Sequence, residues 1–242
     1  MKNYQKIEAK NHRLAKALIA TLILKYSQVE NKISQILSLW YAEPNKLLTK
    51  TELRDFPGRK RLSRRAAINL IIKREIKNLE DIVSSSVENL GSRAIHNAFN
   101  STFNQSILYQ RWHPDSTNFE EIIGRNFAKL EYNLKKILIQ NSLTGENLTN
   151  VKRSIHTLFR TELRSLSRLI QTETTFFTSE GIKLYLLEKG ETEYQLIATI
   201  DERTSEICRS LDGQIFKLSD YEVGVTAPPF HPNCRTVISE VI

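Results

Sequence analysis

The C-terminal part of the chain concentrates side chains that can bind a metal ion or act as nucleophiles. Both cysteines, Cys208 and Cys234, lie there together with His231. Thiolate and imidazole groups are ligands that zinc prefers, and the His-x-x-Cys spacing lets two of them reach one ion from a single turn. Asp201 is a candidate fourth ligand. Zn²⁺ is therefore a candidate cofactor, although the paired Cys-x-x-Cys sequences of well-defined zinc sites are absent.

The same residues fit three other interpretations. A Cys208–Cys234 disulfide would stabilise the fold by about 3 kcal/mol but requires oxidising conditions. A Cys–His–Asp nucleophilic site is conceivable, yet the sequence around it lacks a recognisable set of oxyanion donors and a nucleophile turn. A rigid turn fixed by proline, with both thiols packed as small apolar groups, needs no ligand at all. The residues alone leave the four interpretations open, and we single out no catalytic residue.

Most of the chain before this region has the hydrophobic spacing of amphipathic helices. Apolar residues recur at intervals of three, four and seven, and breakers such as Glu43-Pro44 and Asp55-Phe56-Pro57-Gly58 interrupt them. The spacing predicts helices over 14–40, 62–110, 118–140 and 151–178.

After residue 178 the period changes from 3.6 to 2. Runs at 182–187 and 194–200 predict a β-hairpin, and 214–218 and 236–241 are two further candidate strands. We expect a short helix after the hairpin, capped by Asp201 or Thr204 and closed by Gly213.

These elements predict an α+β fold in which a mainly α-helical N-terminal body carries a small C-terminal α+β module. The predicted divisions are a helical arm and linker at 1–60, a helical body at 61–178 and the module at 179–242. The chain of 242 residues is long enough to bury a sizeable core without staples. Two cysteines argue against a disulfide-rich secreted scaffold and fit a reducing compartment. We expect no signal peptide and no membrane span.

The positive charge is concentrated in the N-terminal half. The first 110 residues carry 19 Lys and Arg against 9 Asp and Glu, whereas the remainder carries 16 against 18. The densest cluster, called the basic patch below, is a candidate surface for nucleic acid or an acidic partner. A solvated helix face explains it equally simply, because no aromatic side chains are interleaved for base stacking. The patch consists of Arg59, Lys60, Arg61, Arg64, Arg65, Lys73, Arg74 and Lys77.

The pair Thr172-Glu173 stands near the end of the last predicted helix. We expect Glu173 to dock the module by pairing with Arg203 or Arg235. An exposed carboxylate, worth well under about 1 kcal/mol as a surface pair, is the simpler alternative.

At these residues the sequence resembles the Mu F-like family of bacteriophage head morphogenesis (minor capsid) proteins. The resemblance covers roughly 90–242, and no motif matches in 1–89. Two positions depart from the family pattern: Thr236 stands where a further Cys is common, and Gln171 where Arg often precedes Thr-Glu. The resemblance gives a structural role to nine motif residues, namely Thr172, Glu173, Arg203, Thr204, Gly213, Pro229, Pro232, Asn233 and Arg235. It rests on the ordered motifs Asp201-x-Arg203-Thr204-Ser205-x-x-Cys208, Leu211-Asp212-Gly213 and Pro228-Pro229-x-His231-Pro232-Asn233-Cys234-Arg235.

The resemblance implies a non-enzymatic virion protein of few copies, in a phage or prophage. It would associate with the portal or inner capsid and act in head assembly or DNA delivery. Its expected partners are the portal or capsid protein and packaged DNA. Its expected location is the host cytoplasm during assembly and then the virion. Some members carry a toxin or enzyme domain after the signature, and we expect none here. A basic DNA-binding protein of a mobile element is the alternative function, followed by a Cys–His hydrolase or toxin remnant.

Overall fold

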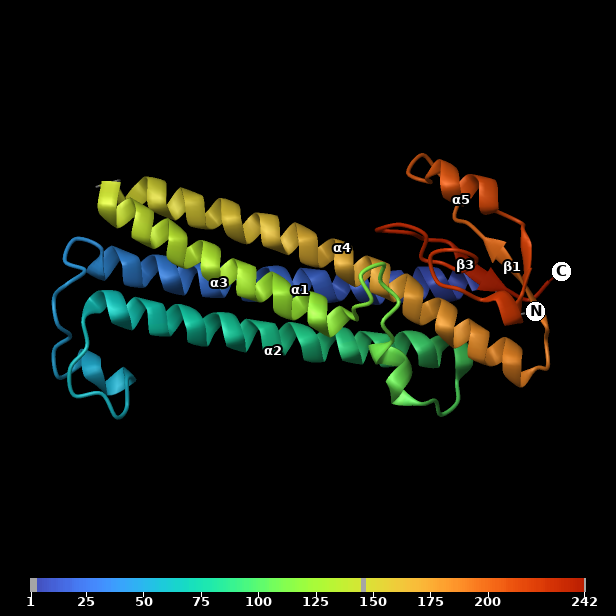
Figure 1. The fold of residues 1–242 in the computed structure, drawn as a ribbon, viewed down its shortest axis with the longest axis horizontal. Coiled ribbons are helices and arrows are strands. Elements are labelled where there is room, and N and C mark those ends of the chain that lie inside the picture. Colours follow the sequence, from blue (N-terminus) through green and yellow to red (C-terminus); the bar gives the residue numbers. More distant parts are fainter. Residues whose placement is uncertain (1–3, 145–146, 242) are drawn as a thin grey trace. The chain divides into compact units, whose positions relative to one another are not determined.

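The computed structural model describes residues 4–144 and 147–241, most of them in four long helices (Figure 1). These are α1 (Tyr4–Trp40), α2 (Arg64–Phe99), α3 (Phe119–Thr144) and α4 (Leu148–Glu188). Short 3₁₀ helices at Glu52–Asp55 and Gln105–Tyr109 interrupt the connections. The mainly helical fold class is confirmed. No helix within the described ranges combines the length and apolar character that crossing a bilayer requires.

The C-terminal elements form the small α+β module that the sequence predicted. Strand β1 (Glu193–Ile197) is central and pairs antiparallel with β2 (Ile215–Lys217) on one side and β3 (Val237–Ser239) on the other. Helix α5 (Glu206–Leu211) lies between β1 and β2 along the chain, and a 3₁₀ turn covers Leu218–Asp220. The strands expected at 214–218 and 236–241 are confirmed in shorter form.

The predicted β-hairpin is wrong, because its first arm is helical. Helix α4 continues ten residues past the expected end at Thr178, to Glu188. Ile182 and Leu186 are fully buried in the core of the module, while Leu187 is 52% exposed. Residues four apart lie on the same face of both a strand and a helix, because their spacing fits a period of 2 and nearly fits a period of 3.6. The burial of Ile182 and Leu186 therefore does not distinguish a strand from a helix in the sequence alone.

The chain divides into two compact units that cut across the helices. The first unit comprises Met1–Thr21, Ser84–Ile122 and Ser165–Ile242, and the second comprises Leu22–Val83 and Ile123–Arg164. In the second unit, Tyr26 of α1 packs against Phe127 of α3 and Phe159 of α4, with ring centroids 6.1 and 6.0 Å apart. An ion pair of 2.8 Å between Lys32 and Glu75 joins α1 to α2 at its surface.

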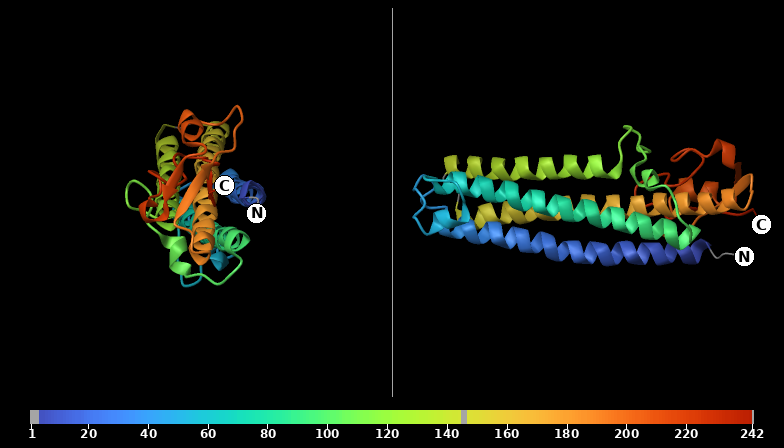
Figure 2. Two further views of the ribbon diagram at one scale, coloured as in Figure 1. Left: turned by 90° about the vertical axis from the view of Figure 1, so that its right-hand side faces the viewer. Right: turned by 90° about the horizontal axis from the view of Figure 1, so that it is seen from below.

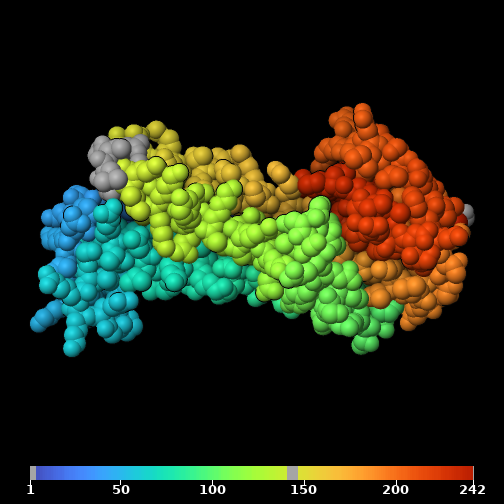
Figure 3. Space-filling view, in the orientation of Figure 1, coloured from blue at the N-terminus to red at the C-terminus, as the bar shows by residue number. Residues whose placement is uncertain are grey.

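In the first unit, the sheet packs on the last turns of α4. Both views of Figure 2 place the orange and red strands beside the orange end of α4, and the space-filling view (Figure 3) shows their surfaces adjoining. Tyr194 and Leu196 of β1 and Ile238 of β3 are fully buried against Ile182 and Leu186. The sheet therefore gains its stability from one face buried on a helix, as a sheet of three short strands requires.

Helix α4 also approaches α2 closely in this unit. At Gly181, an added Cβ would lie 2.8 Å from the backbone oxygen of Ile95 and 2.9 Å from Cβ of Ala98. One helix turn earlier, Thr178 accepts a hydrogen bond from Asn11, which also donates to the carbonyl of Ala94. A side chain at Gly181 would force the helices apart, so this glycine sets how near α4 and α2 come.

Candidate functional site

Two short segments of the module bring the cysteines and the histidine together. Ser205 caps α5 by accepting a hydrogen bond of 3.2 Å from the backbone N–H of Cys208, which places Cys208 in the first helical turn. The N-cap is therefore Ser205 rather than the predicted Asp201 or Thr204. The second segment follows the cis peptide between Pro228 and Pro229.

That second segment turns tightly before β3. The backbone N–H of Cys234 donates to the carbonyl of His231 over 3.1 Å, and Asn233 adopts a positive φ of 60°. Asparagine tolerates this left-handed conformation better than most residues. The turn directs His231 and Cys234 toward Cys208.

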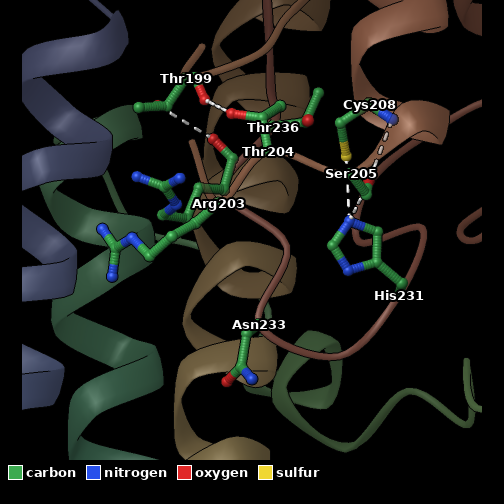
Figure 4. Close-up of a pocket in the computed structure, with 9 residues that line it drawn as sticks. Thr199, Arg203, Thr204, Ser205, Cys208, His231, Asn233 and Thr236 are labelled. Carbon is green, nitrogen blue, oxygen red and sulfur yellow. Dashed lines mark hydrogen bonds between the residues drawn. The ribbon is translucent and has the colours of Figure 1, made fainter. Parts of the chain in front are cut away.

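The three predicted donor side chains form one cluster, and Figure 4 shows two of them, Cys208 and His231. Sγ of Cys208 lies 3.1 Å from Nε2 of His231 and 3.7 Å from Sγ of Cys234. The ligand atoms of all three residues lie within 4.8 Å of one another. Both thiols are free and buried, and His231 is partly exposed. The distances suit either a hydrogen-bonded thiol pair or a shared metal ion.

A hydrogen bond from Nδ1 fixes the orientation of the His231 imidazole. Nδ1 lies 2.9 Å from the carbonyl oxygen of Pro232, which can only accept, so Nδ1 carries a proton. Nε2 thereby points to Cys208 and to the hydroxyl of Ser205, whose oxygen is 2.8 Å away. A backbone carbonyl on the second nitrogen is the usual way in which proteins orient a histidine that binds a metal or takes part in proton transfer.

The two thiols differ in acidity because they share one hydrogen bond. The bond from Cys234, together with those involving Ser205 and His231, lowers the pKa of Cys208 to about 4 against the opposing effect of burial. The neighbouring Cys208 thiolate and burial raise the pKa of Cys234. Cys208 is therefore the more acidic of the two thiols.

Asp201 does not join the cluster, so its prediction as a fourth ligand is wrong for this structure. Its carboxylate accepts two hydrogen bonds from the guanidinium of Arg235, at 2.8 and 2.5 Å, and a third from the backbone N–H of Arg203. The Arg235 hydrogen bonds hold the pKa of Asp201 well below its usual range. A bidentate arginine occupies the oxygens that a metal would need.

Glu173 is buried and does not pair with Arg203 or Arg235, which corrects the predicted docking contact. Its carboxylate lies 2.6 Å from Nε2 of His113 and accepts a 3.2 Å hydrogen bond from the indole of Trp112. Burial raises the pKa of Glu173. The exposed-carboxylate alternative is also wrong. Sequence reasoning missed both partners because they lie 60 residues earlier, in the connection before α3.

Threonines of α4 dock the module instead. Oγ1 of Thr172 accepts a 3.0 Å hydrogen bond from the backbone N–H of Asn233, and the hydroxyl of Thr175 donates to the carbonyl of Cys234. Of the Thr172-Glu173 pair, Thr172 is thus the residue that forms a hydrogen bond with the module. The signal for Thr175 is the run of threonines at 172, 174, 175 and 178, which are unusual as buried helical residues.

The remaining motif residues shape the loops around the cluster. Thr204 donates to the carbonyl of Thr199 over 2.7 Å and accepts from the backbone N–H of Asp201, while Arg203 is largely exposed. Gly213 follows α5 with φ of 81°, as expected for a helix-closing glycine. A pocket of about 210 Å³, including its open mouth, lies beside the cluster, and Thr199, Arg203 and Thr236 are among its lining residues.

The basic patch lies in the second unit, in and after the loop between α1 and α2. Arg64, Arg74 and Lys77 form ion pairs with neighbouring carboxylates at 2.9, 3.1 and 3.0 Å. These ion pairs neutralise part of the positive charge of the basic patch. The other members are exposed: Arg59, Lys60, Arg61, Arg65 and Lys73.

Comparison with known families adds the decisive observation. Residues 132–239 match the family model described as Phage Mu protein F like protein. Over these residues the chain is similar to the Mu F-like family. The Mu F-like segment runs from α3 to β3, and it contains Thr172, Glu173 and the whole thiol–imidazole cluster. The resemblance is thereby confirmed, while 90–131, which it also covered, lie outside the match. No curated protein and no solved structure matched the chain.

Proposed function

We propose that this chain acts in the assembly of phage heads as a minor capsid protein, without catalytic turnover. The match of residues 132–239 to a phage protein family carries the proposal. We infer further that it associates with the portal or inner capsid, joins the particle in the host cytoplasm, remains in the virion and contributes to DNA delivery.

The way in which the module is fixed supports a structural role. Hydrogen bonds from Asn233 and Thr175 join the turn before β3 to α4, and the sheet buries its apolar face on the same helix. Arg235 and Asp201 tie that turn to the loop before α5. A module held at several points by one helix presents a constant surface to a partner and fits an assembly component.

Co-expression with the genes that flank it tests the proposal. Particles would be sedimented and blotted for this chain at low and high salt, with the chain expressed alone and the flanking genes expressed alone as controls. Co-sedimentation with capsid-sized particles at high salt is the expected result. A chain that stays soluble in the presence of normal particles would refute association with the head.

DNA binding is the second candidate function, because Arg59, Lys60 and Arg61 form an exposed basic loop. Binding through the three phosphates that this loop can neutralise would weaken by about 40-fold between about 50 and 200 mM salt. Replacing all three with Gln should lower the salt slope by up to about 3. The matched control neutralises three exposed lysines elsewhere in the second unit, namely Lys25, Lys129 and Lys136. An equal loss in both triple variants, or no binding at all, would exclude the loop as a DNA site.

A Cys–His hydrolase or toxin remnant is the third candidate, favoured by the 3.1 Å contact of Cys208 with His231. In such an enzyme Cys208 would be the nucleophile, and its loss would abolish function even if the chain remained folded. A Cys208→Ala chain that folds normally and still supports head assembly would eliminate it. A folded Cys208→Ala chain that supports none would favour it over the structural role.

A further inference from the structure

The thiols of Cys208 and Cys234 have the separation that one tetrahedral zinc ion imposes on two ligands. Zn–S bonds of about 2.3 Å at the tetrahedral angle place two sulfur atoms about 3.8 Å apart. The observed distance is 3.7 Å. A disulfide needs sulfur atoms about 2.05 Å apart, so it would require these groups to move much closer.

We propose that Cys208 Sγ, Cys234 Sγ and His231 Nε2 bind one Zn²⁺ ion, with a water molecule as the fourth ligand. A Zn–N bond of about 2.0 Å puts the imidazole nitrogen roughly 3.6 Å from each sulfur. It lies 3.1 Å from Cys208 in the structure. The ring therefore withdraws by about half an ångström when the ion enters, which a partly exposed side chain on a loop accommodates.

The surroundings of the three ligands are already those of a metal site. The carbonyl of Pro232 orients the imidazole through Nδ1, so the unprotonated Nε2, which lies 2.8 Å from the Ser205 hydroxyl, can exchange that contact for the ion. The backbone carrying Cys234 is fixed by the hydroxyl of Thr175, and the backbone carrying Cys208 by the cap at Ser205. Each ligand is thus positioned by a contact that does not involve the metal.

Cys208 and His231 line the pocket shown in Figure 4, and the proposed fourth ligand lies on that side. No carboxylate supplies it, because Asp201 is held by Arg235. The hydroxyl of Thr236 lines this pocket beside the Cys208 thiol, and its buried oxygen pairs with no protein oxygen or nitrogen atom among the described residues. A water molecule on the ion would satisfy that hydroxyl, since metal-bound water both donates and accepts hydrogen bonds. Three protein ligands and one water are the composition of an open site.

Binding of the ion would join α5 to the turn before β3 and, through Thr172 and Thr175, to α4. Zinc binding at such a junction contributes to folding, because the unfolded chain does not hold the ligands together. The ion would therefore stabilise the module. This inference rests on the cluster alone and holds whether or not the chain assembles phage heads.

Metal analysis of the full chain, purified without chelators and after removal of any affinity tag, tests the proposal. The variants are Cys208→Ser and His231→Gln, and the matched control is His156→Gln, which changes an exposed histidine paired with Glu30 in the second unit. The wild type and the control should contain about one zinc ion per chain, and the two variants should lose most of it. Chelation should lower the melting temperature of the wild type.

Two further measurements use the unmodified chain, so that a misfolded variant does not decide the question. Co²⁺ added to the metal-free chain should give the thiolate charge-transfer and tetrahedral absorption bands of a Cys₂His site. Added zinc should protect both cysteines from alkylation. A folded wild type with less than about a tenth of an ion per chain and no Co²⁺ bands would overturn the proposal. Equal zinc in all variants would overturn it too, as would a mass showing that both thiols are oxidised to a disulfide in the freshly purified chain.

Discussion

Substitution of Gly181 by alanine tests the close approach of α4 to α2 and the helical extension of α4. The new Cβ would lie 2.8 Å from the oxygen of Ile95 and 2.9 Å from Cβ of Ala98. Neither atom can swing away, so the two helices must separate. Overpacking of this kind costs about 2–3 kcal/mol, and the better helix propensity of alanine returns about 1 kcal/mol. We therefore expect a net loss of about 1–2 kcal/mol.

The matched control is Gly124→Ala in α3, where the nearest atom to the new Cβ is a carboxylate oxygen of Glu80 at 3.6 Å. That distance is ordinary contact, so this variant should gain about 0.5–1 kcal/mol. Urea unfolding followed by far-UV circular dichroism measures both changes. For a chain of this length, the loss at Gly181 corresponds to a melting temperature roughly 2–8 °C lower. Equal or greater stability of Gly181→Ala would refute the close packing.

Three further predictions concern the first unit. Thr172→Val removes the acceptor of the Asn233 N–H and should lower the free energy of unfolding by about 1–2 kcal/mol in urea titrations; no change would show that the turn is held elsewhere. Burial raises the pKa of Glu8 from 4.5 to about 7. The contribution of Glu8 to stability should therefore be lost as the pH rises from 4.5 to about 7, whereas that of His12, whose pKa burial lowers to about 4, grows over much of the same range. In unfolding measured against pH, the stability of the wild type relative to Glu8→Gln should fall over this range, and a constant difference would contradict the shift. Arg235→Lys should destabilise the chain at pH 7 but not below the depressed pKa of Asp201, because protonation removes the pair; a pH-independent difference would contradict this.

The sequence was sufficient for the long helices because their apolar spacing extends over many turns. It was also sufficient for the grouping of Cys208, His231 and Cys234, since these are the chain's only thiols and the histidine nearest to them. It failed at 182–187, where the buried pair Ile182 and Leu186 suits both periods. Only the sheet packed on their face distinguishes the two.

The predicted charge pairing failed for a different reason. A buried carboxylate pairs with whichever basic side chain the fold brings next to it. The distance between two residues along the sequence does not show which segments the fold brings together. Glu173 contacts His113 and Trp112. Arg235, a predicted partner of Glu173, pairs with Asp201 instead. Hydroxyl-to-backbone contacts such as that of Thr175 with Cys234 are equally invisible to spacing arguments, because any exposed carbonyl accepts them.

Deletion and complementation in the phage or prophage that encodes this chain test the central claim most directly. Electron microscopy and infectivity assays would compare particles made without the gene, with the wild-type gene and with a gene for an unrelated protein. The account predicts that deletion lowers the number of normal, infectious heads and that only the wild-type gene restores it. Normal heads in normal numbers, with full infectivity, in the absence of the chain would contradict a role in head assembly.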